Sequence, residues 1–294
     1  TSYIPESTAK LVRMLRVPVV VLRIHGNFIT QPQWNKIDKG NHIEAEMEQI
    51  ITAKECKKLT VAEIDARVKE AFQYDDFKWQ YENKIHIDHP KRAEGLHALL
   101  YKCPACQTEG EMHSKGIKLW CEHCGKEWEM DEYGRMHALI GDTEFHHIPD
   151  WSNWERECVR KEIEEGTYYF EDTARIETLP GSLKFYYQGE GKVIQTPTET
   201  RIECNYHGEP YVLTRSSMDL ESMHIEYDYL GRGDCIDVSI PNDSFWCYLT
   251  KRDVITKISF ATEEMHLLAV RKAAEEKAAA EKAKEALKET EKSE

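Results

Sequence analysis

Two pairs of closely spaced cysteines constrain this chain more than any other feature of its sequence. The pairs lie in CPAC at 103–106 and CEHC at 121–124, and the segment between them is long enough for one hairpin, with Gly116 and Gly125 available for turns. A tight turn within each pair points both sulfurs inward, and four thiolates suit the tetrahedral coordination of zinc. We therefore predict a zinc ribbon over residues 102–140. Its predicted ligands are Cys103, Cys106, Cys121 and Cys124.

The predicted zinc site is structural rather than catalytic. Four cysteine ligands close the coordination shell and leave no open position for water. The alternatives, two unrelated pairs or a redox CxxC, explain the paired order less well. The chain has nine cysteines, an odd number that does not suit a disulfide framework. Together with the absence of a signal-peptide pattern, this favours a reducing, cytoplasmic setting.

Composition excludes several classes of protein. The net charge of −14 leaves no basic surplus for phosphates, so we expect no nucleic-acid partner. No apolar run approaches the roughly 18–20 residues of a membrane-spanning helix. The chain opens on Thr1-Ser2-Tyr3, without an initiator Met, and we expect it to be a fragment or a processed product.

The segments before the cysteines predict a helix, a strand and then mostly helix. Residues 5–15 have an amphipathic helical pattern. Residues 16–23 are β-branched and apolar on both faces, which is typical of a strand in a covered, mostly parallel sheet. Residues 40–101 are charged, with a capping box at 60–63 that opens one helix and a second short helix over 92–101.

The segments after the cysteines predict a helix and then a β-rich domain. Residues 150–165 form a predicted helix capped by Asp150 and closed by Gly166. Many short runs with β character follow between residues 168 and 250, separated by turn residues, and they predict an antiparallel sandwich or barrel. A helix beginning near Thr262 would cover its open end, which is the outline of a pleckstrin-homology-like domain. The covering side chains would be Ala261, Met265, Leu268 and Val270.

The other candidate sites carry weaker signals. His146, His147 and Asp150 could form a second metal cluster, but a histidine pair in a loop is more often polar surface. His137 and Asp142 have a His-x4-Asp spacing, which we attribute to chance because the chain has 13 histidines and many acids. We predict that Cys235 and Cys247, on neighbouring strands, are buried as small apolar groups.

Residues 2–22 read SYIPESTAKLVRMLRVPVVVL, in which a Pro-Glu pair precedes a helical stretch and then Val-Pro-Val at 17–19. This order resembles the 1-acyl-sn-glycerol-3-phosphate acyltransferase family. The segments HGN at 25–27 and QPQW at 31–34 are similar to the loop that trails this strand in a bacterial branch with an added cysteine ribbon and a β-rich tail. Later segments similar to that branch are 148–151 and 224–231.

The resemblance implies transfer of a fatty acyl group from acyl-CoA or acyl carrier protein to the hydroxyl of a lysophospholipid. In that family a His deprotonates the hydroxyl and an Asp orients the His. Both residues, and the glycerophosphate motif, would lie upstream of Thr1. We therefore expect this chain alone to be inactive and assign it no catalytic or substrate-binding residue. The implied setting is cytoplasmic, with peripheral contact at the inner face of the membrane.

A second hypothesis is a non-enzymatic module in which the ribbon and the pleckstrin-like domain recognise a lipid headgroup or a protein. The two hypotheses differ in whether the reading frame continues upstream with a His-x4-Asp motif.

The predicted fold class is α+β. Its predicted divisions are the C-terminal edge of an acyltransferase sheet (1–39), a helical linker (40–101), the zinc ribbon (102–140), a connecting helix (141–166), the β-rich domain with its capping helix (167–270) and a charged helical tail (271–294).

Overall fold

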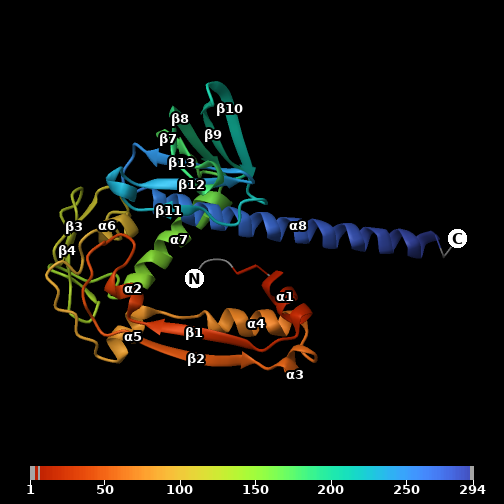
Figure 1. Cartoon of the computed structure of the whole chain (residues 1–294), viewed down its shortest axis with the longest axis horizontal. Coiled ribbons are helices and arrows are strands. Elements are labelled where there is room, and N and C mark those ends of the chain that lie inside the picture. Colours follow the sequence, from red (N-terminus) through yellow and green to blue (C-terminus); the bar gives the residue numbers. More distant parts are fainter. Residues whose placement is uncertain (1–3, 6, 292–294) are drawn as a thin grey trace. The chain divides into compact units, whose positions relative to one another are not determined.

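The computed structural model describes residues 4, 5 and 7–291, with the backbone alone for 284–291, and divides into two units (Figure 1). The units are Thr1–Trp154 and Glu155–Glu294. The elements of the first unit are α1 (Ser7–Leu15), β1 (Val19–His25), α2 (Asn27–Thr30), β2 (Glu44–Ile51), α3 (Ala53–Cys56), α4 (Val61–Ala71), α5 (Asp76–Glu82), α6 (Leu96–Leu99), β3 (Met112–Lys115), β4 (Lys118–Cys121), β5 (Glu127–Met130) and β6 (Met136–Ala138).

The boundary between the units falls within helix α7 (Ile148–Glu164). The elements of the second unit are β7 (Phe170–Thr178), β8 (Tyr186–Thr196), β9 (Glu199–Tyr206), β10 (Glu209–Ser216), β11 (His224–Glu226), β12 (Cys235–Ile240), β13 (Asp243–Leu249), α8 (Ile255–Glu291) and two 3-10 turns at Pro180–Ser182 and Tyr229–Gly231. The chain is therefore mixed α and β, as predicted. In the described part of the chain, no helix combines the length and the apolar character needed to cross a membrane.

The predicted helix and strand near the N-terminus are present as α1 and β1. β1 pairs antiparallel with β2, which places Leu22 opposite Met47. The alternate side chains Val20, Leu22 and Ile24 are all exposed. The prediction of a covered, mostly parallel sheet is therefore wrong for the described strands, because the partner of β1 is an antiparallel, acid-rich strand and one sheet face is open.

The segment 40–101 contains the predicted capped helix but is less helical than expected. In α4, the Thr60 side chain accepts a hydrogen bond from the amide of Glu63, whose carboxylate accepts one from the amide of Thr60, so the capping box is confirmed. The strand β2 was missed, because its charged residues suggested a helix. The helix expected over 92–101 is reduced to α6. Gly95 lies immediately before α6, and its left-handed backbone, with φ of +80°, prevents the helix from beginning earlier.

Helix α7 begins at Ile148, two residues before the predicted cap, so Asp150 lies in its first turn and not at its N-cap. An acidic side chain there still interacts favourably with the helix dipole. The predicted end at Gly166 is confirmed. This glycine has a left-handed φ of 73°, and its amide donates to the carbonyl of Ile163.

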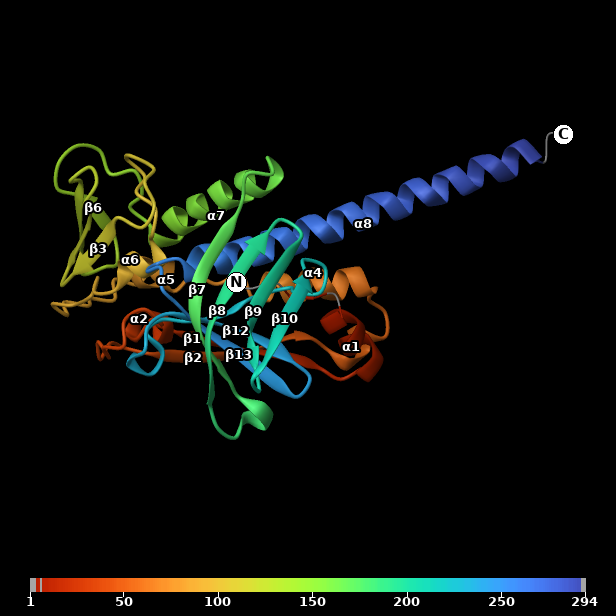
Figure 2. The ribbon, with the colours of Figure 1, turned by 90° about the horizontal axis from the view of Figure 1, so that it is seen from above.

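The second unit contains one antiparallel seven-stranded sheet, with the order β10-β9-β8-β7-β13-β12-β11 (Figure 2). β7, the first of these strands along the chain, pairs with β13, the last. The beginning and the end of the β-rich segment therefore meet in the middle of the sheet. Two of the short runs with β character, at 183–188 and 192–196, contribute to one strand, β8, which has a bulge at Gln188. β7 begins later than predicted, at Phe170, and β11 is reduced to three residues. A bulge increases local twist and lets a sheet curl.

Helix α8 begins at Ile255, earlier than the predicted Thr262. Ala261 and Met265 are buried with Val159 and Ile163, and Leu268 packs against them. Val270, however, is 39% exposed and does not belong to this cluster, because it lies past the last buried turn. The predicted tail helix continues to Glu291. In this tail Glu281 with Lys284 and Glu285 with Lys288 have the spacing of helix neighbours, which favours side-chain pairs, but the side chains from 284 on are outside the described residues.

The curl of the sheet predicts a severe effect at Gly191. A Cβ there would lie 2.5 Å from the carbonyl oxygen of Glu203 and 2.8 Å from Cγ1 of Ile176. We expect Gly191→Ala to lower the free energy of unfolding by about 1–3 kcal/mol, because the neighbouring backbone must move. Chemical denaturation measures this loss. The control is Glu190→Ala, at the adjacent exposed residue, which should leave the free energy of unfolding nearly unchanged. Equal losses in the two variants would contradict the role assigned to the close contacts of Gly191.

Candidate metal centre

The four cysteines lie on two knuckles with the same hydrogen-bond pattern. In the first, the amide of Cys103 donates to the carbonyl of Thr108, and the amide of Gln107 donates back to the carbonyl of Cys103. In the second, Cys121 makes the corresponding bonds with Lys126 and Gly125. Each loop needs a left-handed residue at its fifth position, which is Gly125 in one and Gln107, with φ of 63°, in the other. Each knuckle is therefore a local structure, and the same structure occurs twice in the chain.

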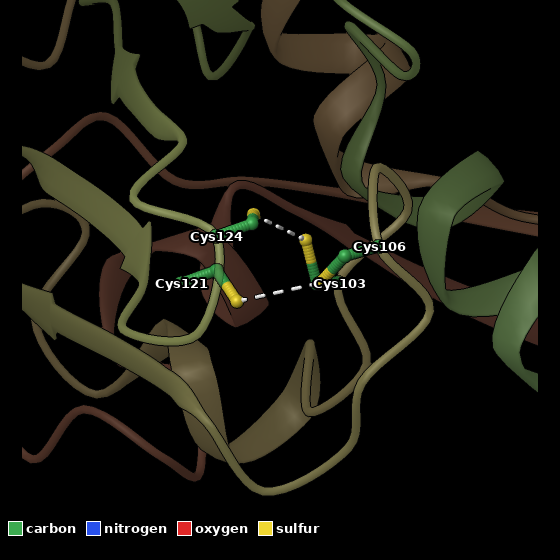
Figure 3. Close-up of side chains that lie close together, drawn as sticks. All are labelled: Cys103, Cys106, Cys121 and Cys124. Atoms are coloured by element: carbon green, nitrogen blue, oxygen red, sulfur yellow. Dashed lines mark hydrogen bonds between the residues drawn. The ribbon is translucent and has the colours of Figure 1, made fainter.

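The hairpin β3–β4 brings the two knuckles together, so that all four sulfurs lie within 4.8 Å of one another (Figure 3). The Cys103 and Cys124 sulfurs are 3.7 Å apart, and those of Cys106 and Cys121 are 3.8 Å apart. A tetrahedral site with metal–sulfur bonds of about 2.3 Å has sulfur–sulfur edges of about 3.8 Å. The four predicted ligands therefore fit around one metal ion.

The surroundings of the sulfurs divide them into buried and accessible thiols. Burial raises the pKa of the Cys103 thiol, and it also raises the pKa of the Cys121 thiol. Burial acts in the same direction on Cys106, but hydrogen bonds with Thr108 and His123 outweigh it and lower the pKa of this thiol to about 6. Metal binding requires thiolates and releases their remaining protons, so the ion would hold in the charged form groups that burial alone keeps neutral.

An apolar cluster supports the site from one side. Cys103 and Cys121 belong to it, together with the fully buried Trp128 and Trp151, whose rings lie 5.0 Å apart. The indole of Trp151 donates to the carbonyl of Lys102, next to the first ligand. Residues from β5 and the start of α7 thus fix the position of the first knuckle.

The histidines considered as a second metal site have other partners. Nδ1 of His146 lies 2.9 Å from the carbonyl oxygen of Met136, and Nε2 of His147 lies 2.6 Å from Oδ2 of Asp75. Nε2 of His137 lies 2.9 Å from Oδ2 of Asp131, which is a different carboxylate from that of the His-x4-Asp spacing. Among the described side chains, the four cysteines are the group of three or more potential ligands close enough to hold a metal ion.

Cys235 and Cys247 are buried on the neighbouring strands β12 and β13, as predicted. Burial raises the pKa of the Cys235 thiol to about 12, so it is neutral at physiological pH.

Two polar networks were not predicted from the sequence. One is the His147–Asp75 pair, in which Asp75 also caps α5 through the amide of Lys78. The other is a chain in which Nδ1 of His25 lies 2.8 Å from the hydroxyl of Tyr74, which donates to the buried Asp76. Partners about 50 and 70 residues apart leave no local signal, so the sequence alone does not reveal them.

Comparisons with known proteins add no assignment: no family model matches the chain, and no curated protein matches it.

Removal of one ligand should abolish metal binding. We expect Cys121→Ser to reduce the bound metal from about one ion per chain to nearly none, because a closed four-thiolate site needs every ligand. The unfolding temperature should fall as well, because metal binding contributes to folding. Elemental analysis and thermal unfolding measure the two effects.

The control is Cys204→Ser, at a half-buried cysteine on β9 outside the cluster. It should keep its metal. Equal metal contents in the two variants would show that the four cysteines do not hold an ion.

The His147–Asp75 hydrogen bond predicts energetic coupling between two distant parts of the sequence. The His147 side chain is 13% exposed and that of Asp75 29% exposed, so solvent weakens the interaction only in part. A double-mutant cycle with His147→Gln and Asp75→Asn should give a coupling energy of about 1–2 kcal/mol in the free energy of unfolding. Additive effects of the two substitutions would contradict a stabilising bond.

Proposed function

We propose that this chain is the C-terminal part of a glycerolipid acyltransferase of the 1-acyl-sn-glycerol-3-phosphate acyltransferase family. The reaction would transfer a fatty acyl group from acyl-CoA or acyl carrier protein to the free hydroxyl of a lysophosphatidic-acid-type acceptor. The observation that carries the proposal is the exposed face of β1, the strand that begins at Val19, the last residue of Val17-Pro18-Val19 in the family-like segment.

This face is apolar and open. Val20, Leu22 and Ile24 are 48%, 56% and 43% exposed, and the neighbouring Met47 on β2 is 74% exposed. A contiguous exposed apolar patch on a sheet normally marks an interaction surface. Among the described strands β1 pairs with β2 alone, so its other edge also carries unpaired backbone groups. Both features support a larger α/β sheet that continues from β1.

The catalytic groups of the proposed enzyme belong to that larger sheet and not to this chain. There a histidine would take the proton of the acceptor hydroxyl and an aspartate would hold its tautomer. The loop that follows β1 is held in place by Asp76, whose carboxylate accepts hydrogen bonds from the amides of Gly26 and Ile29. This chain would thus contribute a fixed edge to the catalytic sheet.

We propose that the metal is zinc and that its role is structural. Four thiolates at tetrahedral spacing are the donor set that zinc prefers, and they leave no position for a substrate or water.

The second candidate is a non-enzymatic binding module. The observation that favours it is the order of the seven strands, in which the first pairs with the last and a C-terminal helix follows. That order supports a pleckstrin-homology-like fold, a fold that serves recognition of lipid headgroups or proteins.

The coding sequence upstream and an activity assay test the proposed function. We expect the upstream sequence to contain a His-x4-Asp motif and a Pro-Glu motif. The extended protein should transfer an acyl group from acyl-CoA or acyl carrier protein to lysophosphatidic acid, whereas the chain described here should not. Radiolabelled or mass-spectrometric product analysis measures the transfer. An upstream sequence without the motif, or an inactive extended protein, would contradict the enzyme and favour the binding module.

A matched pair of variants tests the role of β1 in the extended protein. Leu22→Asp places a charge on the proposed interface, and we expect it to reduce acyl transfer at least tenfold, because burial of an unpaired carboxylate is costly. Val212→Asp places the same charge on β10, at a residue that is also 55% exposed, and should leave transfer unchanged.

A further inference from the structure

Two neighbouring turns of the second unit expose large apolar and aromatic side chains. The turn between β7 and β8 projects beyond the ends of β9 and β10 (Figure 2) and carries Leu183, which is 89% exposed. Tyr186 and Tyr187 follow it and are 48% and 59% exposed, and the turn before β12 carries Leu230, which is 61% exposed. We call these four residues the leucine–tyrosine rim.

Packed aromatic side chains support the rim. Phe185 and Tyr229, each close in sequence to one of the leucines, pack together with rings 6.3 Å apart, and both contact Trp246. The two turns therefore belong to one surface. Leu230 has a left-handed backbone, with φ of 55°, which is unfavourable for a leucine. The fold thus tolerates strain in a residue whose side chain is left in solvent, a combination typical of functional positions.

Cationic groups flank the rim. Arg175 and Arg232 both bind the carboxylate of the buried Glu177, at 2.7 and 2.6 Å, and their side chains remain 52% and 41% exposed. Two guanidinium groups share one carboxylate, so a positive charge remains at the surface. The guanidinium of Arg175 lies 4.5 Å from the centre of the Tyr187 ring, and Lys184 adds another cation beside Leu183.

The acids of the second turn are engaged within that turn. The carboxylate of Asp228 accepts a hydrogen bond from the amide of Gly233, and that of Asp234 accepts one from the amide of Asp228. Hydrogen bonds to neutral amides do not neutralise a carboxylate, so both acids keep their charge. They lie in the second turn, whereas Arg175 and Lys184 flank the first.

We propose that the leucine–tyrosine rim is a membrane-contact surface, in which Leu183 and Leu230 enter the lipid interface, the tyrosines lie at the level of the headgroups and the cations face lipid phosphates. Leucine, tyrosine and long cationic side chains are the residues that suit these three depths. The choice of a membrane as partner rests on the proposed function, whose acceptor is a lipid. The rim would bring that enzyme to its substrate.

Vesicle sedimentation of the whole chain with bound metal tests the rim without any need for activity. We expect the chain to sediment with vesicles of phosphatidylcholine and phosphatidylglycerol, and less with phosphatidylcholine alone. The double variant Leu183→Asp/Leu230→Asp should reduce the partition coefficient at least tenfold, since each exposed leucine contributes through burial of its apolar surface. Lys184→Gln should reduce the partition coefficient about fivefold on vesicles that contain phosphatidylglycerol and leave it unchanged on phosphatidylcholine vesicles.

Val212→Asp is the matched control, because it adds the same charge at an exposed apolar residue of the same sheet, and it should bind as the unmodified chain does. Metal content and circular dichroism establish that every variant is folded. The proposal is overturned if the unmodified chain ignores both vesicles, if the double variant binds equally well, or if Val212→Asp binds as weakly as the double variant. A change from oligomer to monomer in the double variant would instead assign the rim to contact between copies.

The outcome separates this inference from the proposed function. Vesicle binding by the rim together with an inactive extended protein would keep the membrane surface and reject the acyltransferase. Acyl transfer by an extended protein whose rim variant still binds vesicles would keep the acyltransferase and reject the membrane surface.

Discussion

The gathering of four sulfurs around one point is the constraint on which the four-stranded part of the first unit depends. Strands β3 to β6 have only three or four residues each, which is too short for a sheet to be stable by pairing alone. The two knuckles are separated along the chain, and each can form locally. A metal ion bound to both would close the hairpin and hold the buried Cys103 and Cys121 as thiolates. The surrounding tryptophans then pack against a fixed framework.

The second unit is organised by buried acids that need partners. Glu264 has a side chain that is 4% exposed and binds both Arg156 and Arg160, which join α7 to α8. Glu177, whose side chain is 3% exposed, likewise binds both Arg175 and Arg232. A buried carboxylate without a cation is strongly destabilising, so these pairs allow few alternative positions of the helices and turns that carry them. In the case of Glu177, the same requirement places two guanidinium groups at the surface beside exposed aromatic rings.

Two of the exposed apolar regions among the described residues, the face of β1 and the leucine–tyrosine rim, differ in shape, and the difference suits different partners. The face of β1 is a flat row of side chains next to an open strand edge, which is the geometry that accepts more sheet. The leucine–tyrosine rim is formed by two turns with apolar tips and cations behind them, which is the geometry of an interface with lipid. A protein surface and a membrane surface are thus proposed for separate parts of the chain.

The sequence by itself determined the features that depend on local chemistry. The CxxC spacing predicted the cluster of four cysteines, and Thr60 and Glu63 predicted the start of α4. The short β-rich runs between turn residues predicted an antiparallel sandwich or barrel with a terminal helix, and the structure has a single curled antiparallel sheet followed by that helix. Tertiary structure alone decided which residues meet across long separations. It paired β1 with the charged β2, placed the start of α6 after Gly95, and brought Asp75 to His147 and Arg232 to Glu177. Such contacts depend on how separate elements pack. Hydrophobic periodicity marks which face of an element is buried, but it does not identify the distant residue that this face will meet.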